Sequence, residues 1–77
     1  MQIDAEITAF TARLARNPDE AMPHLEQMVR TAREIGGKLA QDVEQLKRDF
    51  YQYQKGAVRL EKIQEDAIRI KHEVRPL

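Results

Sequence analysis

The sequence contains no cysteine, no serine and no tryptophan, and only 5% of its 77 residues are aromatic. Without cysteine there are no disulfides and no thiolate chemistry. The 13 basic and 13 acidic residues cancel, which argues against a polybasic arm for nucleic acid or membranes, because such an arm needs charge of one sign. Apolar runs are only a few residues long, far too short to span a bilayer. We therefore expect a soluble, cytoplasmic chain.

The residue types that carry chemistry are scattered. His24 and His72 are isolated, with no other ligands at zinc-like spacing. Gly36-Gly37 lacks the strand and lysine that define a phosphate-binding loop, so it indicates a turn. The sequence predicts no enzyme, no metal site and no cofactor.

The second half of the chain has a long apolar seam at spacings of three and four residues. Its members are Leu39, Val43, Leu46, Phe50, Tyr53, Ala57 and Leu60. This spacing indicates one face of a helix, because a strand requires period two. No proline interrupts the stretch, so the pattern predicts one helix over 38–74, about 55 Å long at 1.5 Å per residue. Beyond Leu60 the seam shifts by an extra three residues, which indicates either a stammer or a helix packing in a wider bundle.

The first half predicts two shorter helices. Ile3, Ile7, Phe10 and Leu14 define an amphipathic helix over 2–16, and a second helix is expected over 18–35. Pro23 requires either a separate short turn before it or a distorted first helical turn. At Gly36-Gly37 we expect a hairpin turn, with one uninterrupted helix as the alternative. The fold predicted for residues 1–77 is a single small all-α domain, a helical hairpin or coiled-coil-like bundle.

A core this small gives only marginal stability, so we expect association with another chain to add to it. A seam of this length requires a second helix, from the same chain or from another. We expect a homodimer that also binds a helical partner as a scaffold, adaptor or chaperone. Parallel and antiparallel pairing are both left open, as are the partner and the biological process. The predicted interface comprises Val43, Leu46, Phe50, Tyr53, Leu60, Ile63 and Ile70.

Two alternative functions remain. A nucleic-acid-binding helical dimer would use the cations Arg30, Arg33, Lys47, Arg48, Lys55 and Arg59. A filament-forming secretion component or its export chaperone is the other. The segment Leu14-Ala15-Arg16-Asn17-Pro18, followed by Pro23, resembles the segment joining the two helices of type III secretion needle subunits. The resemblance covers only this segment, its second proline comes later than in that family, and no family is assigned from it.

Overall fold

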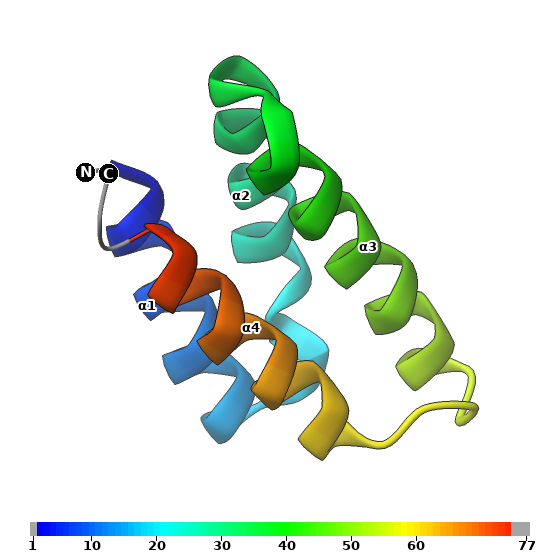
Figure 1. Cartoon of the computed structure of the whole chain (residues 1–77). Coiled ribbons are helices and arrows are strands. Elements are labelled where there is room, and N and C mark those ends of the chain that lie inside the picture. Colours follow the sequence, from blue (N-terminus) through cyan, green and yellow to red (C-terminus); the bar gives the residue numbers. More distant parts are fainter. Residues whose placement is uncertain (1, 75–77) are drawn as a thin grey trace.

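The computed structural model describes residues 2–74 and is all-helical, which confirms the predicted fold class. Four α-helices and one short 3₁₀ helix follow one another along the chain (Figure 1). Their bounds are α1 Gln2–Arg16, η1 Pro18–Glu20, α2 Met22–Ile35, α3 Gly37–Gln54 and α4 Leu60–Val74.

Each helix packs against the next one in sequence, and α4 also packs against α1, so the four helices form a closed bundle (Figure 1). The described chain measures 33 × 21 × 19 Å. Short connections between neighbours give antiparallel pairs, as expected for an up-down-up-down bundle. The ring of four helices from one chain supplies the packing surface that the apolar seam requires.

The two prolines of the first half each occupy a tolerated position. Pro18 opens η1, and Pro23 lies in the first turn of α2, where a helical residue has no N–H partner to lose. The separate short turn is therefore the alternative that the structure adopts. The N–H of Leu25 still bonds to the carbonyl of Ala21 at 3.1 Å, so the helix continues undistorted beyond the proline.

The turn between α2 and α3 is formed by Gly36 and Gly37. Both have positive φ, 82° and 66°. With ψ at −169°, Gly36 occupies a region that is essentially accessible only to glycine. The chain folds back at this point, so the alternative of one uninterrupted helix through the glycines is not what the structure shows.

The predicted helix over 38–74 is wrong, because the chain leaves the helix after Gln54 and starts α4 only at Leu60. The N–H of Gly56 bonds to the Tyr53 carbonyl, and that of Ala57 to the Gln52 carbonyl, both at 2.9 Å. This pair of bonds is a Schellman motif, which ends a helix with glycine at a positive φ, here 83°. The apparent stammer is a loop, and Ala57 is exposed rather than part of the seam.

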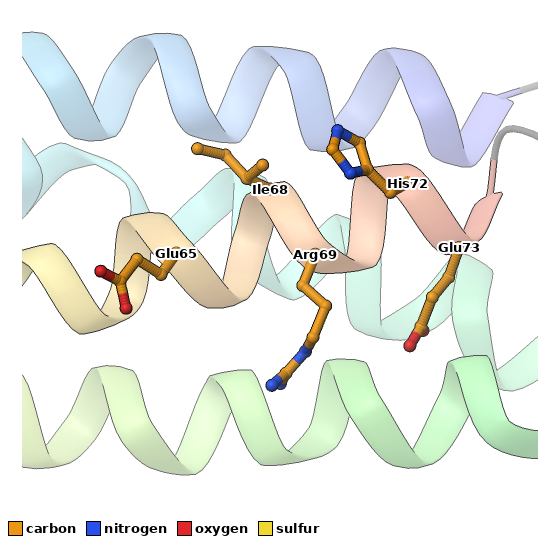
Figure 2. A pocket seen from close by; sticks show the side chains of 5 residues that line it. All are labelled: Glu65, Ile68, Arg69, His72 and Glu73. Carbon is orange, nitrogen blue, oxygen red and sulfur yellow. The ribbon is translucent and has the colours of Figure 1, made fainter.

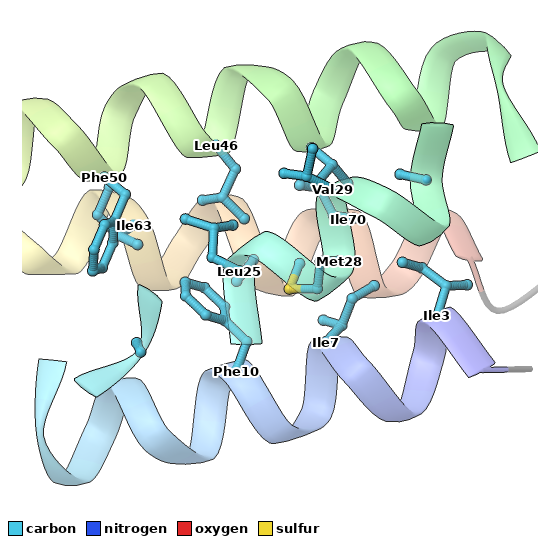
Figure 3. Close-up of a cluster of buried hydrophobic side chains, with 14 of the residues drawn as sticks. Ile3, Ile7, Phe10, Leu25, Met28, Val29, Leu46, Phe50, Ile63 and Ile70 are labelled. Carbon is cyan, nitrogen blue, oxygen red and sulfur yellow. The ribbon is translucent and has the colours of Figure 1, made fainter. Parts of the chain in front are cut away.

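All four helices contribute to one apolar core, and Figure 3 shows their side chains meeting between the ribbons. The rings of Phe10 and Phe50 pack edge to face with centroids 6.2 Å apart, joining α1 to α3. Phe50 also contacts Tyr53, with centroids 5.8 Å apart. The apolar residues predicted for the helix over 2–16 are all fully buried.

Candidate functional site

The residues predicted to form an interface lie inside the bundle. Five of them are at most 1% exposed, and Tyr53 and Leu60 are half-buried. The five buried side chains are Val43, Leu46, Phe50, Ile63 and Ile70. The chain's own helices already occupy the surface that a partner would need, because the turn at Gly56 lays α4 back along α3. The expected docking seam is thus the core of a single chain.

The cations considered for nucleic-acid contact are spread over two helices and a loop. Arg30 and Arg33 lie on α2, Lys47 and Arg48 lie on α3, and Lys55 and Arg59 lie in the connection to α4. The Nε of Arg33 is 2.7 Å from Oε1 of Glu44, so its charge is neutralised across the α2–α3 groove. Tyr51, which is 44% exposed, lies on α3 one turn from Lys47.

The contact between α3 and α4 contains two pairs of carboxyl groups that the sequence analysis missed. In the first pair, a hydrogen bond with Glu73 is the main cause that raises the pKa of Asp42, and partial burial adds to it. The same hydrogen bond lowers the pKa of Glu73, and Lys38 reinforces this with its Nζ 3.1 Å from Oε1 of Glu73.

The second pair is Asp49 and Asp66. Asp49 lies seven residues after Asp42 on α3, and Asp66 lies seven residues before Glu73 on α4. Asp66 is only 6% exposed, and this burial raises its pKa, with a further contribution from the hydrogen bond to Asp49. Lys62 lies 3.4 Å from Asp66 and 3.7 Å from Asp49, and Arg69 lies 3.4 Å from Asp66. The seven-residue spacing on both helices is a sequence signal for these pairs, but only once α3 and α4 are recognised as antiparallel neighbours.

A separate feature lies on the side of α4 that faces away from the core. Glu61, Glu65, Ile68 and His72 are exposed and follow one another at spacings of four, three and four residues. We call these four residues the outer stripe of α4. Ile68 is 51% exposed, the most exposed large apolar side chain among the described residues. It lies in a shallow hollow lined also by Glu65, Arg69, His72 and Glu73 (Figure 2).

The hollow divides into two sides. Ile68 and His72 point toward α1, whereas Arg69 and Glu73 point toward α3 (Figure 2). Arg69 and Glu73 are held on the α3 side by their ion pairs with Asp66 and Lys38. The apolar side chain and the imidazole therefore remain free of these intramolecular pairs.

Helix α1, which borders the Ile68 side, presents small residues outward. Ala5, Thr8 and Ala12 are exposed and recur at helical spacing. Lys71 of α4 reaches across to α1, and its Nζ donates a hydrogen bond to the Thr8 hydroxyl at 3.0 Å.

The fold and this surface together describe a small antiparallel four-helix bundle with one exposed isoleucine on a charged helix face. Residues 2–74 contain no cluster of three or more side chains suited to hold a metal ion. None of the described helices is both long and apolar enough to cross a membrane. No protein-family model, curated protein or solved structure matches the chain.

Proposed function

We propose that this chain is a small protein-protein interaction module, acting as a scaffold, adaptor or chaperone, that forms a homodimer and engages helical partners. The surface that we assign to this role is the outer stripe of α4 and not the buried seam. The observation that carries the proposal is Ile68, half exposed at the centre of a helix face whose other members are charged or polar. An apolar centre with a polar rim is the usual anatomy of a protein interface.

The interior of the bundle supports this assignment. Its apolar side chains are satisfied by the four helices, so no exposed core seam competes for a partner. Elsewhere, Ile35 and Tyr51 are the other large exposed apolar side chains among the described residues. Tyr51 lies among cations, and Ile35 lies at the end of α2 beside the glycine turn, so neither occupies the middle of a helix face bordered by small residues.

The test is light scattering coupled to size exclusion over a range of protein concentrations. We expect the mass to rise from 9.0 kDa toward about 18 kDa, twice that of one chain. Replacing Ile68 with Asp should weaken the dimer at least about tenfold, because a carboxylate then has to be desolvated in the interface. Ile35→Asp is the matched control and should dimerise like the wild type. A monomer of wild-type protein at every concentration contradicts self-association.

Nucleic-acid binding is the weaker alternative. Four of the six predicted cations share α2 and α3 with Glu26, Glu34 and Glu44, and Arg33 is already paired with Glu44. The positive field that attracts phosphates requires cations that are not neutralised locally. The exposed Tyr51 and the proximity of Lys47 are the only features of this surface that favour it.

A further inference from the structure

We infer that the outer stripe of α4 binds the same stripe of a second copy of this chain, in antiparallel orientation about a two-fold axis that passes near Ile68. This inference rests on the proposed function and adds the occupant and its direction. The inference rests on the order of the glutamates and the histidine along α4 and on the space beside this helix.

The outer stripe is acidic before Ile68 and carries a hydrogen-bond donor after it. Glu61 and Glu65 precede Ile68 on the helix, and His72 follows it. Glu65 is three residues before Ile68 and His72 is four residues after it, so the two are nearly equidistant from the isoleucine. An antiparallel copy brings each Glu65 opposite the other chain's His72, whereas a parallel copy brings Glu65 opposite Glu65. Only the antiparallel arrangement pairs a carboxylate with an imidazole N–H twice.

On the half of α4 that follows Ile68, His72 is the group that can complement a partner's Glu65, because the neighbouring cations are held elsewhere. Arg69 is directed toward α3 by Asp66, with the two groups 3.4 Å apart. Lys71 is directed toward α1 by its bond to Thr8. Within residues 2–74, the His72 side chain makes no hydrogen bond or ion pair, and it is exposed beside Ile68 (Figure 2). It is therefore the donor in the second half of the stripe that a partner's Glu65 can reach.

Space for the second copy lies on the α1 side. Ile68 and His72 point that way (Figure 2), and Thr8 is the exposed α1 residue that contacts α4, through Lys71. Helices approach within 8–10 Å when the side chains between them are small enough to interdigitate. The short side chain of Thr8 lets the partner's α4 approach the groove between α1 and α4, so contact is not limited to one isoleucine.

Charge reversal tests the orientation, with the dissociation constant of each dimer measured by analytical ultracentrifugation. Glu65→Lys alone and His72→Glu alone should each weaken self-association about tenfold, because the first removes both carboxylates that accept from His72 and the second places carboxylates opposite one another twice. The double variant E65K/H72E should regain a dissociation constant within about threefold of wild type. An equimolar mixture of the two single variants should form heterodimers. Circular dichroism verifies that each exposed substitution leaves the helices intact.

A second set of variants gives an independent readout, because the chain has no cysteine of its own. Under oxidation, a mixture of Glu65→Cys and His72→Cys chains should give disulfide-linked dimers, while Glu65→Cys alone should not. Two results overturn the antiparallel arrangement: cross-linking of Glu65→Cys to itself, or an E65K/H72E variant that stays as weak as the single variants. If Ile68→Asp still weakens the dimer, either result leaves the proposed module standing. A wild-type protein that stays monomeric overturns the self-association that underlies both.

Discussion

Asp66 is the residue at which burial and charge conflict most directly. Its carboxylate is almost fully buried between α3 and α4, beside the carboxyl group of Asp49. The cations that compensate it, Lys62 and Arg69, are themselves half exposed, so solvent screens their attraction. The pKa of Asp66 is raised, so folding disfavours its carboxylate relative to water.

Replacing Asp66 with Asn should therefore make the bundle at least as stable as wild type at pH 7. A group whose pKa is raised by folding contributes stability that is fully present below its unfolded value, here 3.8, and is lost as pH rises through the folded value. Asparagine keeps the shape without ionising, so the advantage of D66N should shrink as pH falls toward 3.8. Urea unfolding across this pH range measures the difference.

The comparison with wild type is needed because other groups titrate in the same range. Asp42 acts in the same direction as Asp66, since its pKa is also raised, whereas the lowered pKa of Glu73 acts in the opposite direction. The difference between D66N and wild type removes both contributions. A D66N protein that is less stable than wild type at pH 7 contradicts the prediction and means that the ion pairs outweigh burial.

At the scale of helices, periodicity locates the inward face of each one but not where it ends. Leu39, Val43, Leu46 and Phe50 are buried as their spacing predicts. The same spacing continues through Ala57 only by coincidence, since that residue lies in a loop. Gly56 is the sequence signal for the end of this helix, because glycine is the commonest residue at the left-handed position that ends helices.

Gly56 is also where the connection between α3 and α4 is most sensitive. Gly56→Ala should lower the free energy of unfolding by about 1–2 kcal/mol, because alanine at φ 83° brings its Cβ against the backbone. No other heavy atom lies within 4 Å of the added Cβ, so the loss reports the backbone alone. Gly56→Asn is the matched variant and should lose less, since asparagine tolerates this conformation. Equal losses in urea unfolding would contradict a backbone origin.

For the whole molecule, sequence reasoning identified the need for more helices and expected them both from a hairpin in the same chain and from a second copy. The seam on α3 and α4 is covered by α1 and α2 of the same chain, because the turns at Gly36-Gly37 and Gly56 fold it into four helices. Long-range pairing of this kind is not encoded in local periodicity. The carboxyl pairs Asp42–Glu73 and Asp49–Asp66 escaped notice for the same reason. Ile68 is apolar, yet only the packing of α4 shows that it faces outward.

The stability of the folded bundle should depend on its own concentration if the outer stripe of α4 binds a second copy. Association with the folded state alone stabilises it by about 2.7 kcal/mol at one hundred times the dissociation constant. For a bundle of this size, each kcal/mol raises Tm by roughly 4–8 °C. Calorimetry of wild type should therefore show a Tm that rises with concentration, whereas Ile68→Asp should show a constant Tm. A wild-type Tm that is also constant would mean that the four helices account for all of the stability and that the exposed isoleucine binds no second copy.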